Sequence, residues 1–168
     1  MLKVLIPVDS SRNCQFALKH VIKEFVNNTA MEIHLLNVQP PFSRHITQFV
    51  SKATLRDYHR AEADKALRPC MQMLDNFGIP YSVHRTVGHK AQCITDTAHR
   101  LRCDLILMST ARKNSLTRLV ESSVTNKVLE LTSVPVEVIA GDAMSRWERY
   151  GIPAAIAAVL ALFLAAAD

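Results

Sequence analysis

The sequence predicts a single α/β domain with a doubly wound, five-stranded parallel sheet, and three observations lead to this fold class. Five short apolar runs of strand length alternate with four segments whose apolar residues recur at helical spacing. The 168 residues are the length of one ordinary domain. The 49% hydrophobic and 21% charged residues are typical of a globular protein rather than a disordered one.

The first half of the chain predicts two buried strands. Residues 2–8 form an apolar run that ends at Asp9 and two serines, which predict a strand followed by a helix cap. The helix that follows is expected to bury Cys14, Leu18, Val21 and Phe25. Residues 31–38 predict the second strand, which ends before Pro40 and Pro41 because proline cannot continue the ladder.

A long helix is predicted over residues 47–76. Pro69 is expected to kink it or to limit its regularity, and the segment around Gly78 is expected to end it. Its inward face is predicted to carry Ala63, Ala66, Leu67, Cys70 and Leu74.

The second half predicts three more strands. Residues 81–87 alternate in polarity, which indicates a half-exposed strand or an edge strand. Residues 104–108 are the most apolar run, which indicates a central strand. Pro135 places the last strand, residues 134–139, at a sheet edge. The helix before residue 104 is expected to bury Ala91, Ile94, Ala98 and Leu101. Ser115 is expected to cap the last helix, with Leu116, Val120, Val124 and Val128 inward.

Ligands of such sheets bind outside the carboxyl ends of the strands, where the strand order reverses. The segments to inspect are therefore residues 9–13, 37–41 and 109–115. The last of these carries Arg112 and Lys113 before a helix, and it predicts either an anion site or a solvated polar loop that caps the helix.

Several function classes lack support in the sequence. The turn after the first strand has no glycine-rich phosphate loop, and no His-x-Gly-His signature occurs in the sequence. The histidines are expected at surface positions and form no catalytic set, so we predict that the protein is not an enzyme. The net charge of +5 is too small, and the basic residues are too scattered along the chain, to predict a nucleic-acid partner. The four cysteines form no C-x-x-C pair, which predicts no metal site and leaves Cys14 and Cys70 as buried small hydrophobes. The N-terminus resembles no signal peptide, so a cytoplasmic, reduced domain is expected.

Four segments in order resemble the universal stress protein family: residues 3–11, 35–38, 104–129 and 133–139. The resemblance covers about residues 1–140 and implies the strand order 3-2-1-4-5, a role in the stress response and a homodimer formed through the last strand. That contact would involve Val134, Val136 and Val138.

The resemblance also implies an adenine-nucleotide site, in a degenerate form. Where the nucleotide-binding branch carries three glycines, this chain has Ser109, Arg112 and Ser122, although the next hydroxyl residue, Ser123, is retained. Side chains in place of glycine are expected to crowd a triphosphate, so ATP binding should be weak or absent. Asp9 is either an adenosine contact or only a cap of the first helix. The candidate site comprises Pro7, Val8, Asp9, Ser10, Val38, Ser109, Thr110, Arg112, Ser122, Ser123 and Val124.

The domain is predicted to span residues 1–141, followed by a basic and aromatic linker, residues 142–150, and an apolar tail, residues 151–168. Residues 151–167 carry no charge, and Trp147 and Tyr150 precede them as interface anchors would. The tail predicts either attachment to the inner membrane or a helix packed on a partner protein.

Overall fold

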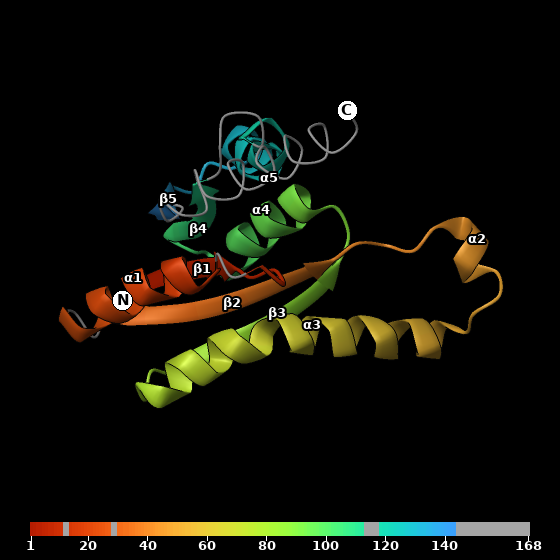
Figure 1. Cartoon of the computed structure of the whole chain (residues 1–168), viewed down its shortest axis with the longest axis horizontal. Coiled ribbons are helices and arrows are strands. Elements are labelled where there is room, and N and C mark those ends of the chain that lie inside the picture. Colours follow the sequence, from red (N-terminus) through yellow and green to blue (C-terminus); the bar gives the residue numbers. More distant parts are fainter. Residues whose placement is uncertain (12–13, 28–29, 113–117, 144–168) are drawn as a thin grey trace, which may run out of the picture.

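The fold is a parallel sheet of five strands with helices on both faces (Figure 1). The computed structural model describes residues 1–11, 14–27, 30–112 and 118–143. The strands are β1 (Leu2–Pro7), β2 (Met31–Gln39), β3 (Tyr81–Val87), β4 (Leu105–Arg112) and β5 (Val136–Ala143). They lie in the order β3-β2-β1-β4-β5, and all pairs are parallel, which confirms the predicted fold class.

Helices cover the sheet on two sides and enclose two apolar clusters. The helices are α1 (Cys14–Asn27), α2 (Arg44–Thr47), α3 (Lys52–Asn76), α4 (Lys90–Leu101) and α5 (Arg118–Leu131). Alternation along β1 divides the core: Val4 and Ile6 pack with α1 and α3, whereas Leu5 packs with α4 and α5. Because both faces of the interior strands are covered, β1 and the first half of β4 read as apolar runs, whereas the edge strand β3 alternates.

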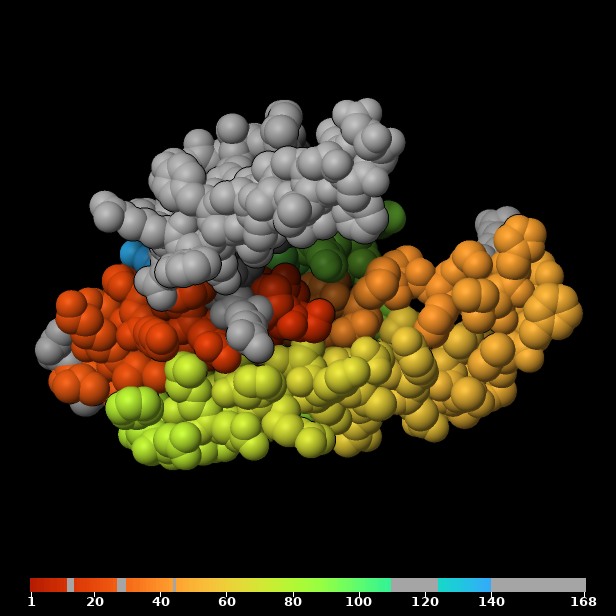
Figure 2. All heavy atoms as spheres, viewed as in Figure 1, coloured from red at the N-terminus to blue at the C-terminus, as the bar shows by residue number. Residues whose placement is uncertain are grey.

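The predicted long helix begins later than expected. α3 starts at Lys52, where the side chain of Ser51 accepts a hydrogen bond from the Thr54 amide at 3.1 Å, and the helix continues through Pro69. All five residues predicted for its inward face are buried. It ends at Asn76, and Gly78 follows with a φ of +63° that lets the Ile79 amide reach the Leu74 carbonyl at 3.1 Å. Together with α2, the first turns of α3 extend past the sheet (Figures 1 and 2).

The two strands at the carboxyl-terminal side are shifted relative to their predicted positions. β4 continues to Arg112, and β5 runs from Val136 to Ala143, because the two strands pair from Ile106 onward. β5 and β3 form the two edges, as predicted, and β4 is an interior strand, although the middle strand is β1. β5 therefore includes the first two residues of the predicted linker.

The predicted helix cap at Ser115 and the apolar tail, residues 151–167, lie outside the described residues. Among the residues that the structure describes, no helix has both the length and the apolar character needed to cross a membrane.

Candidate functional site

The carboxyl edge between β1 and β4 is the point where the strand order reverses. The two strands pair at only two positions, Val4 with Leu105 and Leu5 with Ile106, whereas β1 pairs with β2 at six. Beyond these pairs, the described parts of β1 and β4 share no further register. A crevice between strands that end side by side is the usual ligand position in doubly wound sheets.

The turn after β1 is held by its own aspartate. Asp9 Oδ1 accepts hydrogen bonds from the Ser11 amide at 3.0 Å and from the Ser11 hydroxyl at 2.5 Å. Both Asp9 and Ser10 are exposed, whereas Val8 is buried beneath them. Asp9 therefore shapes the turn between β1 and α1, and its exposure leaves the carboxylate at the molecular surface.

A buried amide that the site prediction omitted links β2 to the end of β1. Asn37 is 2% exposed, and its Nδ2 donates to the Val8 carbonyl at 2.8 Å. Its Oδ1 accepts from Gln39 Nε2 at 2.7 Å. A polar residue within an apolar strand was the available sequence signal for Asn37, which fixes Val8 beside Val38 at the carboxyl edge.

The predicted phosphate-side residues divide between a strand and a helix. Ser109, Thr110 and Arg112 belong to β4, where their Cα partners in β5 are Ile139, Ala140 and Ala143, with an irregularity between Thr110 and Arg112. They were expected in a loop, and pairing with β5 is the reason that they are not. Ser122, Ser123 and Val124 lie in α5. Val124 packs against the cluster beneath α4 and α5, so it contributes to the core.

A separate hollow of about 230 Å³ lies where α3 passes the ends of β2 and β3. Its lining is rich in cationic side chains and includes Gln39, Arg56, His59, Arg60, Arg85 and Val87. Arg85 also donates to Asp64 on α3, at 2.7 Å from its Nε. The sequence prediction did not include this hollow, because its cationic residues are dispersed along the chain.

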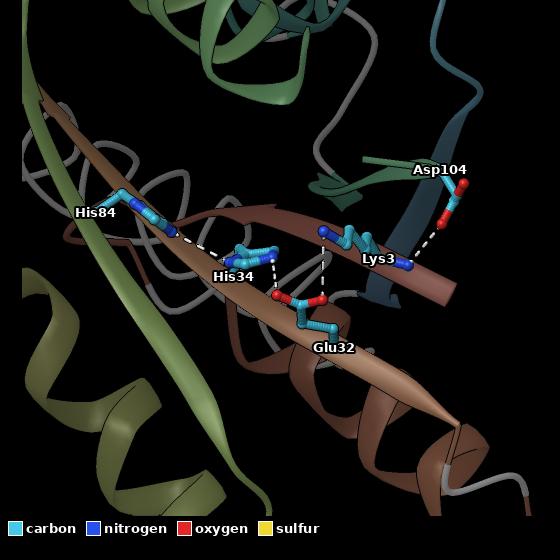
Figure 3. A network of polar contacts seen from close by, with 5 residues as sticks. All are labelled: Lys3, Glu32, His34, His84 and Asp104. Carbon is cyan, nitrogen blue, oxygen red and sulfur yellow. Dashed lines mark hydrogen bonds and ion pairs between the residues drawn. The ribbon is translucent and has the colours of Figure 1, made fainter. Parts of the chain in front are cut away.

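A polar network crosses the amino-terminal half of the sheet (Figure 3). His34 was expected at the surface, but its side chain is only 5% exposed, because β2 is covered on both faces. Its Nδ1 lies 3.1 Å from Nε2 of His84, so the two rings share a hydrogen bond. Its Nε2 lies 3.2 Å from Glu32 Oε1, an ion-pair distance without hydrogen-bond alignment. Burial lowers the pKa of both histidines.

The same network continues to the start of β4. Lys3 forms an ion pair with Glu32 at 3.5 Å, and the Lys3 amide donates to Asp104 Oδ2 at 2.8 Å (Figure 3). The Asp104 amide donates in turn to the Lys3 carbonyl at 2.8 Å. This reciprocal pair aligns β1 and β4 at the end opposite the crevice.

The three valines of the predicted dimer contact differ in exposure. Val134 lies before β5, and both Val134 and Val136 pack against the cluster under α4 and α5. Val138 is 41% exposed. Of the three, Val138 therefore offers the most accessible side chain on the edge strand.

Both the sequence and the fold are similar to those of known proteins. The universal stress protein family model matches residues 1–140. The chain is 28% identical over 140 residues to a universal stress protein of Methanocaldococcus jannaschii, covering 82% of this chain and 81% of that protein. The solved structure of the hypothetical protein MJ0577 is similar, with 27% identity, a TM-score of 0.63 and coverage of 83% of this chain and 96% of that one. The protein UspA from Lactobacillus plantarum shares the fold, with 24% identity, a TM-score of 0.66 and coverage of 82% and 97%. The chain belongs to the universal stress protein family.

Proposed function

We propose that this protein is a non-enzymatic binding module of the stress response, whose carboxyl-edge crevice holds an adenine nucleotide weakly or not at all and disfavours triphosphates. The observation that carries the proposal is the location of Ser109 and Arg112 in a strand that borders the crevice. The nucleotide-binding pattern that this chain resembles has glycines at these positions. Any side chain at a position where glycine is used would take space that a polyphosphate needs close to the backbone.

A second candidate function is the binding of an adenosine monophosphate. Solved structures of other universal stress proteins hold AMP, cAMP and dAMP, each of which carries a single phosphate. In this chain Asp9, for which the resemblance implies an adenosine contact, is exposed at the carboxyl edge of the sheet, and Asn37 fixes the adjacent strand ends. A site with an intact nucleoside end and a crowded phosphate end would favour AMP over ATP.

Isothermal titration calorimetry of the full chain with ATP, ADP and AMP tests both candidates. Weak or absent heat with ATP is expected, and ATP binding at micromolar affinity would contradict the main proposal. In the variant S109G/R112G/S122G, ATP binding should appear or strengthen. Saturable AMP binding that Asp9→Asn weakens would favour the second candidate, whereas its absence in both proteins would exclude it.

The module is also proposed to act as a homodimer through the edge strand β5. An edge strand presents backbone groups that a second copy can pair with, and Val138 supplies an exposed apolar side chain beside them. Sedimentation of the wild type and of Val138→Lys tests the contact. A dimer that persists unchanged in the lysine variant would place the interface elsewhere.

Attachment to a membrane through residues 151–167 is proposed for the apolar tail. Cell fractionation should find the full chain with membranes and a chain truncated before Trp147 in the soluble fraction. If both proteins fractionate alike, the tail is not an anchor.

A further inference from the structure

Two cysteines from different helices meet inside the core between α1 and α3. Cys14 opens α1 and Cys70 lies in α3, 56 residues further along the chain, yet their sulfur atoms are 3.1 Å apart. Both are free thiols, and Cys14 is 5% exposed whereas Cys70 is fully buried. Reacting atoms at about 3–3.5 Å are at the separation from which a bond can form. The sulfur atoms need to approach by only about 1 Å to reach the length of a disulfide.

The hydrogen bonds of the two thiols run in one direction. Cys70 donates to the sulfur of Cys14, and Cys14 donates to the Ser11 carbonyl at 3.4 Å. The hydrogen bond from Cys70 lowers the pKa of Cys14, against the effects of burial and of the Asp9 charge. The same hydrogen bond, together with burial, raises the pKa of Cys70. The two thiols are therefore unequal: the proton leaves Cys14 first, and Cys14 also has the greater exposure.

We propose that Cys14 and Cys70 are a redox modification site, which a hydroperoxide converts to a reversible intramolecular disulfide. The Cys14 thiolate attacks the terminal oxygen of the hydroperoxide and the O–O bond breaks, so that Cys14 becomes a sulfenic acid. The alkoxide released, or the hydroxide from hydrogen peroxide, takes up the proton that Cys14 gave up and leaves as an alcohol or as water. The sulfur of Cys70 then attacks that of Cys14, and the hydroxide it expels takes the Cys70 proton and leaves as water. Two thiols lose two electrons in total, and one peroxide gains them. An external dithiol reverses the reaction by exchange.

The other two cysteines provide internal controls. Cys93 and Cys103 belong to the cluster on the opposite face of the sheet, beneath α4 and α5. Burial raises the pKa of the Cys103 thiol, which disfavours its reactive thiolate form. The sheet itself separates this pair from Cys14 and Cys70.

The test is a peroxide titration of the reduced full chain, followed by alkylation of the remaining thiols and tryptic digestion. Trypsin places the four cysteines in separate peptides, residues 13–19, 66–85, 91–100 and 103–112. The second peptide begins at residue 66 because the bond before Pro69 resists cleavage. The expected product is the first peptide linked to the second, with a loss of about 2 Da that dithiothreitol reverses. The linkage should form more than about tenfold faster in the native chain than in the same chain unfolded in urea.

Variants separate the roles of the two sulfurs. Cys70→Ser should accumulate a Cys14 sulfenic acid that dimedone traps, and Cys14→Ser should yield neither product. Cys93→Ser and Cys103→Ser should form the linkage at the wild-type rate. The proposal is refuted if the native wild type keeps four alkylatable thiols, if its first disulfide involves Cys93 or Cys103, or if unfolding does not slow the reaction.

Discussion

The contact between the buried His34 and the half-buried His84 should make the stability of the fold depend on pH. Burial lowers the pKa of both rings below the value of about 6.5 that applies in the unfolded chain. The folded state therefore binds fewer protons than the unfolded state as the pH falls through this range. Stability that is present above about pH 6.5 is lost progressively on acidification.

The magnitude follows from the separation of the rings. Their centroids are 5.2 Å apart, so two protonated rings would repel by about 3 kcal/mol at an effective dielectric constant of about 20. The hydrogen bond between them would also be lost, because two imidazolium rings have no acceptor nitrogen. Attraction to Glu32 and partial solvent screening oppose the repulsion, so we expect the free energy of unfolding to fall by about 2 kcal/mol between about pH 8 and pH 5.

Urea denaturation followed by circular dichroism across this pH range measures the effect. His84→Gln keeps a hydrogen-bonding side chain but cannot charge. Burial still lowers the pKa of His34 in this variant, so its unfolding free energy should depend less on pH by about 1 kcal/mol. His45→Gln, at an exposed position in α2, is the matched control and should retain the wild-type dependence. Equal pH dependence in wild type and His84→Gln would refute the reasoning.

Three further predictions concern stability. Leu67→Ala removes a fully buried side chain and should cost about 2–5 kcal/mol in urea denaturation, whereas Leu131→Ala, at a residue 49% exposed, should cost less than about 0.5 kcal/mol; comparable losses would contradict the packing. Gly78→Ala should lower the free energy of unfolding by about 1 kcal/mol because φ is +63°, although a Cβ would have no neighbouring atom within 4 Å. Gly78→Asn should lower it less, and a lower melting temperature for Gly78→Asn than for Gly78→Ala would contradict this order. A disulfide between Cys14 and Cys70 closes a loop of 56 residues and should raise the free energy of unfolding by about 4 kcal/mol compared with the reduced chain. If mass spectrometry shows the linkage but the free energy of unfolding does not rise, the disulfide is strained.

The fold was predictable because its signals are local and repeated. The buried face of α3 followed from helical spacing alone, and Pro135 indicated the edge position of β5. The start of α3 was misplaced, although serine, the residue type of Ser51, is one of those favoured at a helix N-cap. The strand character of Ser109 through Arg112 was missed because it depends on pairing with β5 rather than on propensity.

Parts of the candidate site required the three-dimensional structure. His34 was assigned to the surface from its polarity, but helices cover both faces of β2, so positions on either face, including polar ones, can be buried. Cys14 and Cys70 were each expected to be buried, yet their contact depends on how α1 and α3 are placed against the sheet. No periodicity along the chain encodes a distance between residues on different helices.

The short pairing between β1 and β4 has a thermodynamic consequence. Two register pairs and the reciprocal bonds of Lys3 and Asp104 are the described connections between these strands. A ligand that contacted the carboxyl ends of both β1 and β4 would act as an added crosslink between the two strands. It would bind the folded state and not the unfolded state. Such a ligand would raise the melting temperature as its concentration exceeds its dissociation constant, and it would protect amides of β4 and β5 from hydrogen exchange.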